Sequence, residues 1–144
     1  MQRYVTLGED EAAVAIAAIR EELLRRGKVA VIAVGDSHGE LIGLLRMDGA
    51  PLPSLLVATN KVFTAARERA ATGAVGKVYK DSGWQMANTD PRFTGWDGGV
   101  PVMQDGQVAG AIAVSGLDQT EDAELARLGV AKVMDRVAAG QRPR

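Results

Sequence analysis

Three polar residues that could bind or act on a carboxylate follow an apolar segment near position 46. Arg46 carries a planar guanidinium, which suits two-point hydrogen bonding to a carboxylate. Asp48 could orient Arg46 or transfer a proton, and Lys61 lies on a segment predicted to be helical. We therefore expect these three residues to meet in one cleft. The alternative is a surface pair of Arg46 with Asp48 beside a solvated Lys61.

A second group of candidate ligand-binding residues lies near two predicted strands in the C-terminal half. Gly98 and Gly99 have no side chains, so their backbone N–H groups could stabilise an oxyanion. Trp96 offers an apolar wall beside them. Ser115 precedes Gly116 at a strand-to-helix turn, but it lacks the earlier glycine of a nucleophile elbow, so we count it as a binding candidate.

His38 is the only histidine of the chain. Imidazole can act as a general base or as an axial ligand of haem iron, so His38 is both the catalytic and the metal-binding candidate. Tyr4, Tyr79 and the methionines are the only other candidate axial ligands. A solvated loop histidine without a function is the alternative.

The elements that must position these residues begin with a helix and a hairpin. Apolar residues spaced by three and four predict a helix over residues 9–26, with Gly27 as its C-cap. Residues 28–34 and 40–47 are rich in β-branched and apolar residues and predict two strands joined by a turn at residues 36–39. His38 then lies in the turn and Arg46 at the end of the second strand.

The second half is predicted to contain one or two helices, a second hairpin and a terminal helix. Residues 54–71 predict a helix that carries Lys61, and residues 74–86 predict a weaker one before a loop over 87–99. Strands over 100–103 and 108–114 flank Asp105-Gly106, a dipeptide typical of a type I′ hairpin turn. Asp118 and Glu121 predict a capping box at the start of a terminal helix.

This order predicts an α+β two-layer sandwich, in which helices cover one face of an antiparallel sheet of about four to five strands. We expect one domain over residues 1–140, followed by a polar tail at 141–144.

The composition excludes several kinds of site and partner. The 144 residues include no cysteine, which removes disulfides, zinc–thiolate sites and thiolate nucleophiles. The net charge of −1 gives no electrostatic basis for nucleic-acid binding, and no apolar run approaches the roughly 20 residues of a membrane span. The N-terminus has no secretory signal, so we expect a cytoplasmic protein.

The sequence resembles the GlcG/HbpS-like haem-binding family, formerly a domain of unknown function, over about residues 5–138. The resemblance is carried by the order and spacing of several short segments: residues 31–36, 46–50, 59–65, 98–102, 105–106, 110–116 and 121–122. The family often has histidine directly before the second strand, where this chain has Glu40, and His38 stands two residues earlier.

The resemblance implies an α+β sandwich, a homo-oligomer of two or more copies, and haem as the common ligand. On that hypothesis, Arg46, Lys61 and Arg67 pair with haem propionates, and His38 or Tyr79 approaches the iron. The alternative is a catabolic enzyme without a redox cofactor that acts on a small carboxylate or carbonyl compound. In that case Arg46 holds the carboxylate, the amides of Gly98 and Gly99 stabilise an oxyanion, and Lys61, Asp48 or His38 moves a proton.

Overall fold

Four strands form one open antiparallel sheet, and helices pack on both of its faces. The computed structural model describes residues 1–140. The strands are β1 (Val31–Gly35), β2 (Leu41–Arg46), β3 (Gly99–Gln104) and β4 (Gln107–Ser115), in the order β2-β1-β4-β3. The hairpins β1–β2 and β3–β4 therefore meet through their first and last strands, β1 and β4, which form the centre of the sheet.

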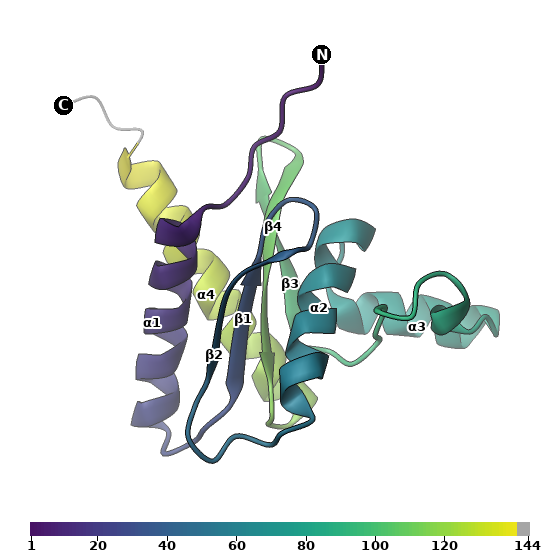
Figure 1. Cartoon of the computed structure of the whole chain (residues 1–144), viewed down its shortest axis with the longest axis horizontal. Helices are drawn as coiled ribbons and strands as arrows, with labels where there is room; N and C mark the ends of the chain where they lie inside the picture. Colours follow the sequence, from purple (N-terminus) through teal and green to yellow (C-terminus); the bar gives the residue numbers. More distant parts are fainter. Residues whose placement is uncertain (141–144) are drawn as a thin grey trace.

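One face of the sheet is covered by the first and last helices, α1 (Glu9–Arg25) and α4 (Gln119–Gly140) (Figure 1). Their apolar residues, including Ile19 and Val133, pack with Ile32, Ile112 and Val114 of the central strands in the larger of two cores. Side chains alternate between the two faces along a strand. The neighbours Val31 and Ala33 therefore belong to the other face.

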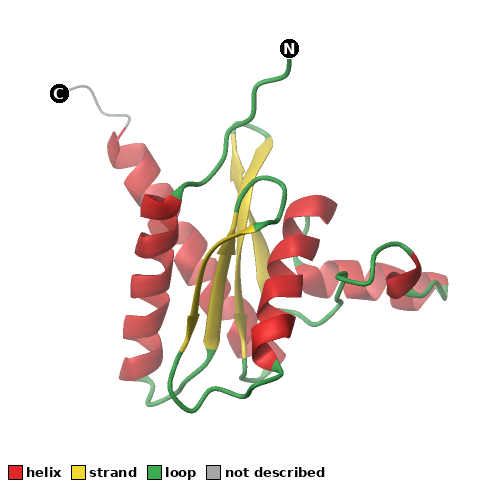
Figure 2. Ribbon diagram, viewed as in Figure 1, coloured by secondary structure: helices red, strands yellow, loops and turns green. Residues whose placement is uncertain are grey.

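The opposite face is covered by α2 (Ser54–Glu68), as Figure 2 shows. The core between α2 and the sheet is built mostly from small side chains, which let the helix backbone approach the strands closely: Ala58, Ala65, Ala66, Ala111 and Ala113. The α+β class and the antiparallel sheet, predicted to have about four to five strands, are confirmed, and the sheet has four. The helices cover both faces of the sheet rather than the one expected, because the connection after β2 places α2 on the face opposite α1 and α4.

The segment between α2 and β3 extends away from the sheet. It contains α3 (Thr72–Ser82) and the short 3-10 helix η1 (Met86–Asn88), and both project from the body of the molecule (Figure 1). Val78 and Trp84 of this segment are largely exposed. The expected helix over 74–86 is thus present, four residues shorter at its C-terminal end.

The turn between β3 and β4 has the conformation that the sequence predicts. Asp105 and Gly106 both have positive φ, 49° and 76°, as a type I′ turn requires. The polar tail predicted at residues 141–144 lies outside the described residues. No helix among residues 1–140 is both long and apolar enough to cross a membrane.

Candidate functional site

Lys61 lies on the buried side of α2, with 1% of its surface exposed. Its ammonium donates hydrogen bonds to the backbone oxygen of Val114 at 2.8 Å and to Oδ2 of Asp122 at 3.2 Å. Burial lowers the pKa of the Lys61 ammonium, and the Asp122 carboxylate partly offsets that effect. Lys61 therefore links α2 to β4 and to the start of α4, and it is not the solvated lysine of the alternative interpretation.

Asp122 directs both of its carboxylate oxygens at protein groups. Its Oδ1 accepts a hydrogen bond from the Leu117 backbone N–H at 3.1 Å, and the Gly116 amide also donates to the carboxylate. Burial raises the pKa of Asp122, whereas Lys61 and these two amides act in the opposite direction. No local sequence pattern marks Asp122 as a site residue, because its partner Lys61 is distant along the chain.

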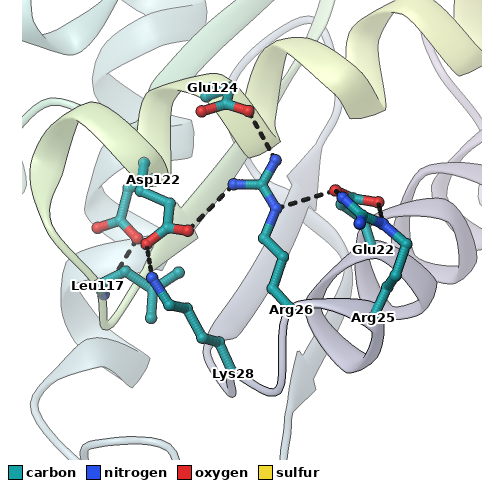
Figure 3. Close-up of polar contacts among 8 residues, drawn as sticks. Glu22, Arg25, Arg26, Lys28, Leu117, Asp122 and Glu124 are labelled. Carbon is teal, nitrogen blue, oxygen red and sulfur yellow. Dashed lines mark hydrogen bonds and ion pairs between the residues drawn. The ribbon is translucent and has the colours of Figure 1, made fainter.

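A second, more exposed polar cluster lies beside Asp122 at the start of α4 (Figure 3). Arg26, at the end of α1, donates to Glu22, Glu121 and Glu124, and Lys28 also binds Glu121. Glu121 is thus paired with two cations of the α1–β1 connection and does not form the predicted capping box. This cluster fixes the first turn of α4 against the end of α1.

A cavity of about 370 Å³ lies beside Lys61 and Asp122. We call it the Lys61 cavity, and its lining includes Ser54, Lys61, Trp96, Ser115, Gln119 and Asp122. Three of the predicted ligand-binding residues, Lys61, Trp96 and Ser115, therefore border one space.

Arg46 and Asp48 do not line this cavity, so the predicted cleft shared by Arg46 and Lys61 is not formed. Arg46 and Ser115 both pair with Val31, on its two sides, which places their backbones two strand spacings or about 10 Å apart. Arg46 lies at the exposed edge strand β2, and no ion pair joins it to Asp48 within residues 1–140. The sequence placed both cations at the same end of the sheet but did not show that β1 separates them.

Gly98 and Gly99 lie next to Lys61, but their amides are not available to an oxyanion. The Gly98 N–H donates to Oδ1 of Asp97 at 2.8 Å, and the Gly99 N–H donates to Oγ1 of Thr72 at 3.0 Å. A Cβ atom on Gly98 would lie 2.7 Å from the Lys61 Nζ. Both amides that the oxyanion role requires thus already have acceptors, and Gly98 leaves room for the buried ammonium.

A larger open cavity of about 520 Å³ lies at the opposite end of α2. We call it the His38 cavity, and its lining includes Arg3, Tyr4, Ser37, His38, Arg67 and Arg69. The Tyr4 and His38 rings meet edge to face with centroids 5.2 Å apart, and Ser37 Oγ lies 3.4 Å from His38 Nδ1. The chain thus places its only histidine among three arginines.

Arg67 and Arg69 of the His38 cavity keep N–H groups that no acceptor within residues 1–140 uses. Arg67 donates through Nε to the His38 backbone oxygen at 2.9 Å and through Nη2 to Glu40 Oε1 at 3.5 Å, and Arg69 donates to the Gly106 oxygen at 3.0 Å. The Arg67 guanidinium also lies over the Phe63 ring, 4.3 Å from its centroid, which orients it. Of the three predicted propionate partners, only Arg67 therefore lies near His38.

Tyr79, the other candidate iron ligand, lies far along the chain on α3. Its hydroxyl forms a hydrogen bond with Thr89 at 3.1 Å, and it lines a separate cavity with Trp84. Tyr4 is the tyrosine that the structure brings to His38. The sequence contained no periodic pattern that would have placed the N-terminal residues there.

The comparisons with known proteins agree with this fold. A family model described as haem degrading protein HbpS-like matches residues 7–131. The chain belongs to the HbpS-like family. Protein GlcG of Escherichia coli strain K12 is 36% identical over 115 residues, which cover 80% of this chain and 85% of GlcG. The family resemblance noted from the sequence is confirmed.

Two solved structures show that the likeness to the HbpS-like family extends through the whole fold. Protein ORFY of Klebsiella pneumoniae is 26% identical, with a TM-score of 0.84 over 93% of this chain and 94% of that one. A double mutant of HbpS from Streptomyces reticuli is 29% identical, with a TM-score of 0.83 over 91% and 89% of the two chains.

Proposed function

We propose that this protein binds haem or a related tetrapyrrole in the His38 cavity. The observation that carries the proposal is the placement of His38 and Tyr4 among Arg3, Arg67 and Arg69 around one open space of about 520 Å³. Membership of a family described as haem degrading protein HbpS-like supports it.

The side chains of this cavity fit the chemistry of haem. Imidazole is a common iron ligand, and a hydrogen bond from Nδ1 to the Ser37 hydroxyl would leave Nε2 for the metal. Guanidinium groups bind carboxylates with two parallel hydrogen bonds, so Arg67 and Arg69 are suited to the propionates. The Tyr4 ring offers an apolar surface to the macrocycle.

Titration of the full chain with haemin tests this function. We expect a saturable Soret shift with the wild-type protein. His38→Ala should change the position of the Soret band and weaken binding by at least about tenfold, or about 1.4 kcal/mol. Tyr79→Phe is the matched control, because it removes the other candidate ligand at a different cavity. An unchanged spectrum and affinity in His38→Ala would contradict the proposal.

We also propose that the protein assembles as a homo-oligomer of at least two copies. Large apolar side chains are more than 60% exposed at the start of α2 and on the projecting segment: Leu52, Leu56, Val78 and Trp84. A second copy would remove this surface from water. Light scattering at micromolar concentration should give at least twice the mass of one chain, and a monomer would contradict this assembly.

A further inference from the structure

The Lys61 cavity contains hydrogen-bond donors that the protein does not use. Ser54 and Ser115 are 6% and 5% exposed, and both line the cavity. Neither hydroxyl forms a hydrogen bond within residues 1–140, and every fully enclosed side-chain polar atom of that range has a partner, so both hydroxyl oxygens are open to the cavity. The two hydroxyls are therefore available to water or to a ligand that enters the cavity.

Lys61 adds a third donor. An ammonium carries three N–H groups, and the two contacts to Val114 and Asp122 engage two of them. The carboxylate that Lys61 binds, Asp122, is also held by the amides of Leu117 and Gly116. The Lys61 ammonium can only donate, and each serine hydroxyl can donate or accept, so a ligand that presents acceptors satisfies all three groups.

The surrounding helices favour an acceptor that is negatively charged. α2 begins at Ser54 and α4 begins at Gln119, and both of these first residues line the cavity. The N-terminus of each helix carries a partial positive charge, and the opposite charges of Lys61 and Asp122 compensate each other. Asp97, a second carboxylate whose charge acts on Lys61, does not line the cavity, so the wall itself carries the Lys61–Asp122 pair and the two helix N-termini.

The rest of the lining of the Lys61 cavity is apolar, which indicates that a bound anion carries an apolar group. Pro51, Val57, Trp96 and Leu117 contribute to the lining, and about 370 Å³ is enough for a small organic molecule. Inorganic anions would leave these side chains without a partner.

We propose that the Lys61 cavity binds the carboxylate of a small organic acid through Ser54, Ser115 and Lys61, with the carbon chain of the acid against Trp96. This site shares no lining residue with the His38 cavity and is independent of haem binding. Lys61 and Asp122 hold the floor of the site, and the two serine hydroxyls are the groups whose hydrogen bonding changes on binding.

Propionate is a suitable probe, because it joins a carboxylate to a short apolar chain, and propionamide is its neutral analogue of nearly equal size. The full chain labelled with ¹⁵N is titrated with each compound, and with inorganic phosphate, in a chloride buffer. We expect saturable propionate shifts centred on the amides of Ser54, Gly116 and Gln119. Propionamide and phosphate should bind at least about tenfold more weakly.

Serine variants test the assignment of the donors. The double variant Ser54→Ala/Ser115→Ala should weaken propionate binding at least about tenfold, whereas Ser82→Ala on α3 should leave it unchanged. If the double variant does not fold, as judged by circular dichroism, the two single variants replace it, each with a smaller loss expected. The proposal is overturned by equal binding of propionate and propionamide, by tighter binding of phosphate, by an unchanged affinity in the serine variants, or by shifts confined to the His38 cavity. The first three of these results have no bearing on the haemin titration, because they concern residues that do not line the His38 cavity.

Discussion

The N-terminal and C-terminal ends of α2 each border a cavity, and the polar groups at the two ends are built differently. At the N-terminal end, Lys61 and Asp122 are buried, paired and fixed by backbone groups. At the C-terminal end, His38 is exposed, and Arg67 and Arg69 each have one hydrogen bond to a backbone oxygen. A buried charge without its partner is costly, whereas an exposed charge is solvated by water. Substitutions at the first end should therefore affect folding, and those at the second end should affect binding.

Asp122→Ala should have the largest effect on stability. It leaves the Lys61 ammonium buried without its carboxylate, so the free energy of unfolding should fall by about 3–5 kcal/mol. Urea denaturation measures this change. The double variant Lys61→Met/Asp122→Leu should recover much of the loss, because it removes both charges and retains apolar volume. A loss below about 1 kcal/mol in Asp122→Ala would show that the pair is not buried as described.

Two glycine substitutions compare the crowded surroundings of Lys61 with the exposed turn between β3 and β4, which lies near the C-terminal end of α2. Gly98 has a φ of 122°, and a Cβ atom there would lie 2.7 Å from both Lys61 Nζ and the Val114 oxygen. Gly106 also has positive φ, but a Cβ atom there would have no neighbour within 4 Å. We expect Gly98→Ala to lower the unfolding free energy by about 3 kcal/mol, from strain and overpacking together. Gly106→Ala should cost about 1 kcal/mol, from the backbone conformation alone. Equal shifts in thermal denaturation would contradict the difference in packing.

Arg67→Ala, at the C-terminal end of α2, should weaken haemin binding with little effect on the stability of the fold. The side chain is partly exposed, and its pair with Glu40 is long at 3.5 Å, so the unfolding free energy should change by less than about 1 kcal/mol. Haemin affinity should fall by about fivefold, which corresponds to about 1 kcal/mol. Arg46→Ala is the matched control, since Arg46 lines neither cavity, and it should bind haemin like the wild type. A larger loss in Arg46→Ala than in Arg67→Ala would move the binding site to the edge strand β2.

The smallest expected effect is the change in unfolding free energy when acid protonates Glu22, a member of the polar cluster that fixes the first turn of α4. Hydrogen bonds from Arg25 and Arg26 lower the pKa of Glu22 from its ordinary value of 4.5 to about 2. The folded state therefore favours the carboxylate, and its contribution to stability is present above pH 4.5 and is lost as the pH falls toward 2. Glu22→Gln should show a shallower loss of stability over that window. Parallel curves for the two proteins would contradict the assignment.

Local sequence patterns were sufficient for most of the secondary structure. The helix predicted at residues 9–26 ends within one residue of α1, because an apolar face at helical spacing followed by Gly27 specifies both the helix and its end. Asp105-Gly106 specified the second hairpin, because few other dipeptides adopt positive φ at both positions. These features depend only on neighbouring residues.

Each cavity is formed by contacts between segments that are far apart in the chain. Such contacts could not be predicted from local sequence patterns. Lys61 was found as a candidate, but its partner Asp122 and the unpaired serine hydroxyls became visible only when α2 was placed on the face opposite α4. Arg46 was misplaced for the same reason, since its distance from Ser115 is set by the strand β1 that lies between them.

The sequence by itself determined the family, the elements and which residue types were available: one histidine, no cysteine, and an excess of small residues near α2. The tertiary structure decided which of them meet. Helix and strand periodicity arises from backbone geometry within a few residues, whereas the side on which a helix crosses the sheet is set by how all apolar faces are buried together. That arrangement buried Lys61 of α2 against Asp122, and it left His38 exposed among arginines.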